Sequence, residues 1–473
     1  MSDLFASLES ASGALRAFQT SVDVSQNNVT NASTPGFARQ DPVLISQPFE
    51  LNSGLIGGIR AGTPQDTRNE FAEAAVRQQT SLLGNFSQIQ TTLQSIEGVF
   101  DVSGNGGIPK ALNDLYQAFS GWSSQPDDAN QRAVVINTAG QVVSEFQQAA
   151  KQLTTAQSFS ERNIQLTLDQ INQAAVAVRD FNVARAQESG PDPGASANLH
   201  ATLENLSKLV NIQVLNQADG SATVLLGGQT PLVIGSQVDP LSLSFTSPAG
   251  SPFPGAPPVA VIKDSLGNDV TSQISSGGLN GLLSVRNGTL PTLIGSPTQA
   301  GDLNTLAKSF ADTVNATLAA GSTTLGPPPT PGPPLFVYGA GSNIAASLAV
   351  SPTITPGQLA AVDPGPPLVS NGTALKLANL ESNPANQING LSFSQFFSSL
   401  ASRVGGQISD ATSGVQVQTG VVAHVHDLRN QVSGVSLDEE AVRIVELQRS
   451  YQAASKIVTV VDELTQTLLG LVQ

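Results

Sequence analysis

The sequence predicts a mainly α-helical chain of several domains (α+β multidomain), with a smaller β-rich domain inserted between long helices. Three observations predict this fold class. Apolar residues recur at alternating steps of three and four over both chain ends and over several interior segments, which is the heptad pattern of packed helices. After residue 210 the pattern alternates and Gly and Pro become frequent, as in short strands joined by turns. The chain, at 473 residues, also exceeds the usual size of one core.

The first element is a predicted helix over residues 2–31. The pair Pro35-Gly36 ends it, because Pro cannot continue a helix and Gly adopts positive φ at little cost. Ser25 fills the one gap in its apolar row. That row consists of Leu4, Leu8, Ala11, Leu15, Phe18, Val22 and Val29.

Three interior helices follow. The first begins at the capping-box pattern Thr67 to Glu70 and is broken by the segment 101–107. A short helix comes after Pro109, and a very long one runs from residue 129 to about 186, which is roughly 80 Å of helix. A helix of this length predicts a shaft. The apolar row of the first interior helix is Phe71, Ala75, Leu82, Phe86, Ile89, Leu93 and Ile96.

Strands are predicted after a further helix at 199–209. Ile212 and Val214 alternate with polar residues, Asp219-Gly220 supplies a hairpin turn, and residues 224–226 return on the far side. The segment 259–261 leads to a second predicted hairpin at Gly267-Asn268. Frequent Pro and Gly through 235–300 fit a small β domain.

Helical periodicity returns at 303–318 and again at 396–432. Between these helices, the proline runs from 326 to 334 predict extended chain. Residues 335–384 are short apolar pieces between Pro and Gly and receive no assignment.

The last helix begins at the capping box Ser436 to Glu439. It carries two apolar rows. The first is Ile444, Leu447, Tyr451, Ala454, Val458, Val461 and Leu468, and the second is Ile457, Val460, Leu464 and Leu471. Because one helical partner needs only one row, two rows predict two neighbours, the chain's own N-terminal helix and another chain. From the pattern alone, a purely internal coiled coil is an equally good interpretation.

Composition excludes several partners. The formal net charge of −15 and a pI near 4.5 oppose binding to nucleic acid or to anionic lipid surfaces. No apolar run reaches the roughly 20 residues that span a bilayer, and the N-terminus lacks the features of a secretory signal, so no membrane insertion is expected. The absence of cysteine removes disulfides and thiolate chemistry.

No catalytic, cofactor or metal site is predicted, and the chain is not expected to be an enzyme. His424 and His426 point about 200° apart on a helix and are interpreted as exposed residues rather than metal ligands. The segment 104–107 lacks the strand and the Lys-Ser/Thr pair of a phosphate loop. Acid pairs such as Asp127-Asp128 lie at helix starts, where carboxylates stabilise the helix dipole.

Both chain ends carry motifs of a known family. The segment Asn27-Asn28-Val29-Thr30-Asn31-Ala32-Ser33-Thr34-Pro35-Gly36-Phe37-Ala38-Arg39-Gln40 resembles the N-terminal signature of flagellar rod, hook and hook-associated proteins. The segment 434–440, with Gln448-Arg449-Ser450-Tyr451-Gln452-Ala453 and Thr467-Leu468-Leu469, looks like the matching C-terminal signature. Both ends match in the right order.

The interior is similar to one branch of that family, the hook-associated protein 1 group of the hook–filament junction. The similar segments are 34–40, 96–100, 112–116, 126–132, 206–210 with 219–220 and 227–229, and 306–315. The chain departs from the branch at 198–204, where a charged Arg- and Asp-rich stretch is usual. The alternative within the family is the hook protein, and outside it a secreted enzyme or an adhesin carried on an axial scaffold.

The resemblance implies an extracellular flagellar role reached through the type III export path without a cleaved signal peptide. It implies four kinds of partner: copies of the chain in a ring, hook protein subunits, hook-associated protein 3 and a cytoplasmic export chaperone. No cofactor is implied.

The predicted organisation follows from these elements. Residues 1–40 and 432–473 form a terminal coiled-coil assembly domain, and 41–210 with 286–320 and 386–431 form a long-helix shaft. Residues 211–285 form a β-rich outer domain, and 321–385 are a Pro/Gly-rich segment that an outer domain could include. The predicted assembly interface is Leu4, Leu8, Leu15, Phe18, Val22, Asn27, Asn28, Asn31, Pro35, Gly36, Phe37, Ile444, Leu447, Tyr451, Val458, Val461, Leu464 and Leu468.

Overall fold

The computed structural model describes residues 2–50, 55–187, 190, 192–383 and 387–472, while the side chains of 2–5, 50, 55–56 and 468–472 lie outside the description. Long helices dominate, with small antiparallel sheets between them, which confirms the predicted fold class. The chain divides into two compact units. The terminal unit comprises residues 1–83, 170–240 and 417–473, and the helical unit comprises 84–169 and 241–416.

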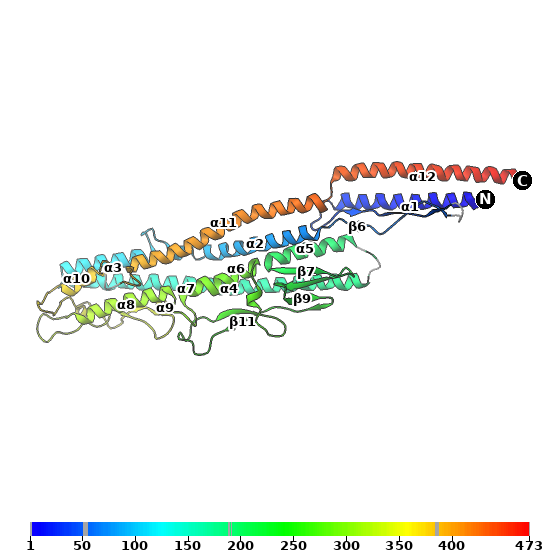
Figure 1. The fold of residues 1–473 in the computed structure, drawn as a ribbon. Helices are drawn as coiled ribbons and strands as arrows, with labels where there is room; N and C mark the ends of the chain where they lie inside the picture. Colours follow the sequence, from blue (N-terminus) through cyan, green and yellow to red (C-terminus); the bar gives the residue numbers. More distant parts are fainter. Residues whose placement is uncertain (1, 51–54, 188–189, 191, 384–386, 473) are drawn as a thin grey trace. The chain divides into compact units, whose positions relative to one another are not determined.

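The terminal unit contains both ends of the chain. Its helices are α1 (Ser2–Asn31), α5 (Pro193–Leu209), α12 (Leu437–Val472), the start of α2 (Glu70–Gln94) and the ends of α4 (Ala129–Gln187) and α11 (Phe393–Ser433). Figure 1 shows α1 and α12 side by side with the N- and C-termini at the same end, so the two helices are antiparallel. Ala11, Ala17 and Val22 of α1 and Ala454 and Val461 of α12 are buried, and such small side chains allow close helix packing.

A β-hairpin follows α1 and packs back along it. Its strands are β1 (Gln40–Asp41), β2 (Leu44–Ser46), β3 (Phe49–Glu50), β4 (Leu55–Ile56), β5 (Ile59–Ala61) and β6 (Gln65–Asp66). The pairs β1–β6, β2–β5 and β3–β4 are all antiparallel. Ser10 Oγ of α1 donates to Gly57 O at 3.2 Å. The sequence predicts no strands here, because strands of two or three residues are too short to display alternation.

A four-stranded sheet lies in the same unit. Its order is β10 (Gln237–Val238), β9 (Thr230–Ile234), β8 (Ala222–Leu226), β7 (Ile212–Asn216). The turn at Asp219-Gly220 joins β7 to β8, which confirms the predicted hairpin. Asn182 near the end of α4 fixes the helix to this sheet, since its Nδ2 donates to Ala222 O and Gly235 O, both at 2.9 Å.

The helical unit has a continuous apolar core of large side chains, including Phe119, Trp122, Phe146 and Phe310. Phe310 packs edge-on against Phe393 with ring centroids 5.4 Å apart. Besides parts of α2, α4 and α11, its elements are α3 (Gly107–Ser124), β11 (Ser242–Thr246), β12 (Val259–Lys263), α6 (Gly277–Ser284), a π-helix (Val285–Thr289), α7 (Leu290–Ile294), α8 (Asp302–Ala320), β13 (Phe336–Val337), α9 (Ile344–Ser347), β14 (Ala349–Val350) and α10 (Gly372–Ala378).

The second predicted hairpin is confirmed as a short turn: Lys263 forms an antiparallel bridge with Asp269, and Val270 N donates to Ile262 O at 2.9 Å. The longer pairing of β12 is with the preceding strand β11, which the sequence did not predict. Asp264 closes a tight turn by accepting hydrogen bonds from the backbone N–H groups of Leu266 and Asn268. Asn287 of the π-helix exchanges two hydrogen bonds with the backbone of Ala260. From Gly277 onward the chain forms helices, where the sequence predicted a β domain.

One further difference concerns the start of α5. Helix α5 begins at Pro193, six residues before the predicted 199, because Asp192 caps it by accepting from the N–H groups of Gly194 and Ala195. Within the segment 321–385, residues 384–385 lie outside the described residues. None of the described helices is long and apolar enough to cross a membrane.

Candidate assembly site

The turn after α1 meets the first turn of α12 through buried polar groups. Asn28 Nδ2 donates to Gln40 O at 2.9 Å and to Glu440 Oε1 at 3.2 Å. Gln40 N donates to Asn28 Oδ1 at 2.9 Å. Asn28, Gln40 and Glu440 are all buried. One amide side chain therefore joins the helix, the hairpin and the C-terminal helix at a single point.

Ser433, the last residue of α11, fixes the same region from the other side. Its backbone O accepts from Arg39 N at 2.9 Å. Its Oγ donates to Thr67 O and accepts from Asn69 N, both at 3.1 Å. The start of α2 is therefore tied to the end of α11 and to the hairpin.

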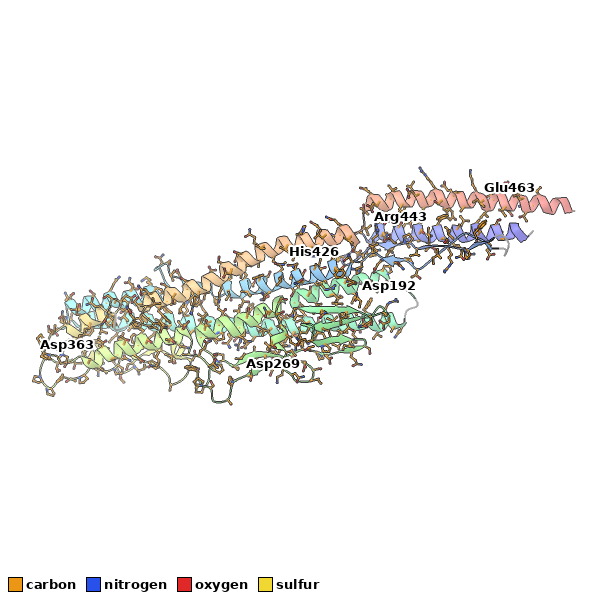
Figure 2. All side chains as sticks on the ribbon, viewed as in Figure 1. Asp192, Asp269, Asp363, His426, Arg443 and Glu463 are labelled. Carbon is orange, nitrogen blue, oxygen red and sulfur yellow. The ribbon has the colours of Figure 1, made fainter. Side chains whose placement is uncertain are left out.

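Ion pairs surround this buried point on its exposed side. Arg443 NH1 lies 3.0 Å from Asp41 Oδ1, and Arg39 NH1 lies 3.4 Å from Glu439 Oε2; Arg443 is labelled in Figure 2. Because these groups are partly exposed, each pair contributes at most about 1 kcal/mol. They orient the helix start more than they stabilise it.

Gly36 brings the turn against α5. Its φ is +76°, and a Cβ at this position would lie 2.3 Å from Ala197 O and 2.9 Å from Ala201 N. Arg68 NH2 donates to Gly36 O at 2.8 Å. Only glycine fits, because a side chain would meet the backbone of α5 directly.

A buried charge cluster lies between α2, α5 and α11. Glu73 Oε1 lies 2.7 Å from Arg68 Nη1. Glu73 Oε2 lies 3.7 Å from Arg429 Nη1 and 4.0 Å from His200 Nδ1. Burial, reinforced by the nearby arginines, lowers the pKa of His200 to about 3, so its imidazole is neutral in the fold. Burial also lowers the pKa of Arg77.

The cluster continues through Glu204 of α5. Arg429 NH1 lies 2.8 Å from Glu204 Oε2, and His426 Nε2 lies 3.3 Å from Glu204 Oε1. His424 is exposed as predicted, but the prediction for His426 is wrong, because that side chain is half-buried beside Glu204. The described residues hold no group of three or more His, Cys, Asp and Glu side chains arranged to bind a metal.

The predicted interface residues whose side chains are described are either buried to some extent or exposed. The side chains of Leu4 and Leu468 lie outside the described residues. Buried or half-buried are Leu8, Leu15, Phe18, Val22, Asn28, Asn31, Gly36, Phe37, Ile444, Leu447, Val458 and Val461, while Asn27, Pro35, Tyr451 and Leu464 are exposed. Of the N-terminal apolar row, Val29 is also exposed, and the buried face turns through Ser21, Ser25 and Asn28 instead.

The outer row of α12 faces away from α1. Ile457, Val460 and Leu464 are 54%, 52% and 51% exposed, whereas Ala454 and Val461 are buried. Tyr451, placed in the inner row by its spacing, is 38% exposed. The helix therefore presents apolar side chains on both sides.

Several residues of this site were missed by the sequence analysis. Gln40, Asp41, Ser433 and Arg443 were not singled out for an interface, and Glu440 was interpreted only as an acid at a helix start. Their partners are backbone groups and side chains far away in the sequence, so no local spacing identifies them. The only available signal was their position within or beside the two terminal signatures.

Comparisons with known proteins find flagellar relatives. A family model described as the flagellar hook-associated protein FlgK helical domain matches residues 93–336, and one described as the flagellar basal body rod FlgEFG protein C-terminal matches residues 430–471. Flagellar hook-associated protein 1 of Bacillus subtilis is 24% identical, and the match covers 99% of each chain.

Other relatives match less of their length. Flagellar hook-associated protein 1 of Escherichia coli is 21% identical over 66% of this chain and 57% of its own length. A solved structure of the flagellar hook junction protein FlgK from Burkholderia pseudomallei has a TM-score of 0.64 at 14% identity, covering 76% of this chain and all of that one. At this identity, the similarity to that structure is a similarity of fold.

Proposed function

Since the chain belongs to the family of the flagellar hook-associated protein FlgK, we propose that it is a structural adapter at the hook–filament junction. In this role the paired end helices assemble with those of neighbouring copies. The observation that carries the proposal is the division of α12, whose inner side packs on α1 while Ile457, Val460 and Leu464 stay about half exposed. Exposed apolar rows of this kind mark interaction surfaces.

The buried polar point supports the same proposal. Asn28 binds both the hairpin and Glu440, so it fixes the register of α1 against α12. A fixed register gives the outer row one defined geometry, which is what a repeated contact between identical copies requires. The terminal segments 1–40 and 432–473 are thus proposed as the assembly domain, with the long helices as the shaft.

The proposed partners are copies of the chain in a ring, hook protein subunits on one side and hook-associated protein 3 on the other. An export chaperone in the cytoplasm would hold the C-terminal helix before assembly, and export would follow the flagellar type III route. A chain built to pack against other proteins in this way needs no catalytic residues, so we propose a role without enzymatic activity.

The alternative role as hook protein has less support. The match to a FlgK helical-domain model over 93–336 favours the junction, and the C-terminal match over 430–471 covers only the last tenth of the chain. No contact or charge arrangement among the described residues favours an enzyme or an adhesin.

A deletion strain tests the proposal. Cells lacking the gene are expected to form complete hooks and to release filament protein into the medium, because filament subunits lack their attachment. Complementation with the wild-type gene should restore filaments. Absence of hooks in the deletion strain would instead assign the chain to the hook itself.

A further inference from the structure

Two proline-rich loops leave the helical unit from one point. Ser322 N donates to Val362 O at 2.8 Å, and Val362 N donates to Ser322 O at 3.1 Å. The first loop follows Ser322 and the second follows Val362, so this bridge places them side by side. We call residues 323–331 and 363–369 together the proline tip.

The first loop is held by its base. Thr323 N donates to Thr330 O at 2.9 Å. Ser322 Oγ, which is buried, accepts from Thr324 N at 3.1 Å and from Thr330 N at 3.0 Å, and donates to Thr324 O at 2.8 Å. One hydroxyl therefore fixes both ends of the loop.

The second loop is closed in a similar way. Asp363 N donates to Val369 O at 2.8 Å, and Val369 N donates to Asp363 O at 3.0 Å. The Asp363 carboxylate also lies 2.6 Å from Lys376 Nζ of α10, and Asp363 is labelled in Figure 2. The salt bridge to Lys376 lowers the pKa of Asp363.

The surface of the tip is mainly apolar, with the hydroxyl-bearing Thr324 and Thr330 also exposed. Leu325, Leu368 and Val369 are 56%, 49% and 38% exposed. Asp363, which is paired, is its only charged residue. Its prolines are Pro327, Pro328, Pro329, Pro331, Pro364, Pro366 and Pro367. Proline has no N–H group, so this stretch offers rings and carbonyl acceptors but few donors.

We propose that the proline tip binds a partner protein through aromatic side chains that also carry hydrogen-bond donors, as Trp and Tyr do. Proline rings pack on aromatic rings, and indole N–H and phenol O–H groups would satisfy the tip's carbonyls. Because both loops are already fixed at their bases and their prolines are stiff, binding orders little additional chain. Because the one charge of the tip is paired with Lys376, a partner meets little local charge there on a chain whose net charge is −15.

A second copy of the chain is a poor occupant. The single Trp of the sequence, Trp122, is fully buried, and Tyr116 is buried as well. Among the described residues, the exposed large aromatic side chains are Phe49, Phe71, Phe159, Phe245 and Tyr451. These five aromatic residues lie on different elements, and only Tyr451 carries a hydrogen-bond donor. The partner is therefore a different protein with an aromatic binding surface.

Selection from a random-peptide phage library tests this inference on the full-length protein. The tip variant Leu325→Ser/Pro328→Ser/Leu368→Ser is used to deplete the library before selection on wild type. Peptides enriched in Trp and Tyr are expected, with at least about tenfold weaker binding to the variant and little change between about 0.1 and about 1 M NaCl. The variant Pro248→Ser/Pro252→Ser, in another exposed proline-containing loop, should bind like wild type.

The inference fails if the selected peptides lack aromatic residues, or if they bind the tip variant as well as wild type. Failure to obtain any peptide that separates wild type from the tip variant counts against it equally. Thermal unfolding checks each variant, and Pro328→Ser/Leu368→Ser replaces the triple variant if that one does not fold. The result is independent of the deletion strain, since it concerns the helical unit's surface and not the terminal helices.

Discussion

Asn28 and Glu440 lie 412 residues apart in the sequence, yet they share a 3.2 Å hydrogen bond that is withdrawn from solvent. The Asn28 amide also donates to and accepts from the backbone of Gln40. This residue belongs to the N-terminal signature, and Glu440 belongs to the C-terminal one. The two signatures therefore describe the two sides of a single contact.

Replacing Asn28 should loosen both chain ends together. Asn28→Ala leaves a buried carboxylate and a buried backbone N–H without their partner, so unfolding of the terminal helices should become easier by about 2–3 kcal/mol. Limited proteolysis should remove α1 and α12 at lower protease concentration than in wild type. Asn27→Ala, which changes an exposed neighbour, should behave like wild type, and equal sensitivity of both variants would contradict the role of the buried amide.

Gly36→Ala should destabilise the turn against α5. The new Cβ would lie 2.3 Å from Ala197 O at a φ of +76°, so either the turn or α5 must move, at an expected cost above about 2 kcal/mol. Urea unfolding measures this. Gly140→Ala in α4 is the matched control: nothing lies within 4 Å of its Cβ, and the helix interior should gain about 0.5–1 kcal/mol.

Stability should fall as the solution is acidified, because of His200. Burial lowers its pKa from the ordinary 6.5 to about 3 in the fold. Between these values the unfolded chain binds a proton that the folded chain does not, so stability is lost as pH falls below 6.5. From pH 7 to pH 5 this amounts to about 2 kcal/mol.

Urea unfolding at both pH values checks this expectation. The variant His200→Gln should lose part of the difference between the two measurements, and His424→Gln, on an exposed position of α11, should keep it. Arg68, Arg77, Arg429 and Glu73 face His200, and all four are unchanged in these variants. An unaltered pH difference in His200→Gln would show that other groups cause the acid sensitivity.

Polar substitution of the outer row should separate folding from assembly. Ile457→Ser with Val460→Ser removes exposed apolar surface and should leave the stability of the purified chain within about 0.5 kcal/mol. If that surface binds neighbouring copies, cells carrying the variant should lose filaments and release filament protein. Val461→Ser changes the buried side of α12 and should also weaken the monomer. Normal motility of the double variant would refute the proposed assembly role of this row.

Periodicity predicted the helices and the β7–β8 hairpin because an apolar face repeats locally along the chain, whichever segment it packs against. It failed where polar residues are buried. In α2, Phe71 was placed in the core row but is 89% exposed, while Glu73 and Arg77 are buried. Those charges are tolerated because Arg68, just before α2, Arg429 of α11 and Glu204 of α5 supply opposite charges. A pattern within α2 carries no information about the last two.

The same reason explains which residues of the candidate site the sequence predicted and which it did not. Leu8, Val22 and Val461 could be selected from spacing alone, since an apolar row needs only an apolar neighbour. Ser433 bonds to backbone groups of Arg39, Thr67 and Asn69. The backbone of Gln40 exchanges two hydrogen bonds with the Asn28 side chain. Hydrogen bonds of that kind depend on tertiary geometry, which composition and spacing do not encode.

The long sequence separation between Asn28 and Glu440 means that this contact forms only in a chain that extends to residue 440. A polypeptide cut short by a premature stop or by a protease before residue 440 retains α1 but lacks the carboxylate and the helix that cover it. Such a fragment exposes one side of α1 and cannot reproduce the two-helix surface that a neighbouring copy would meet. If the chain assembles as proposed, such fragments are expected to stay out of the assembly.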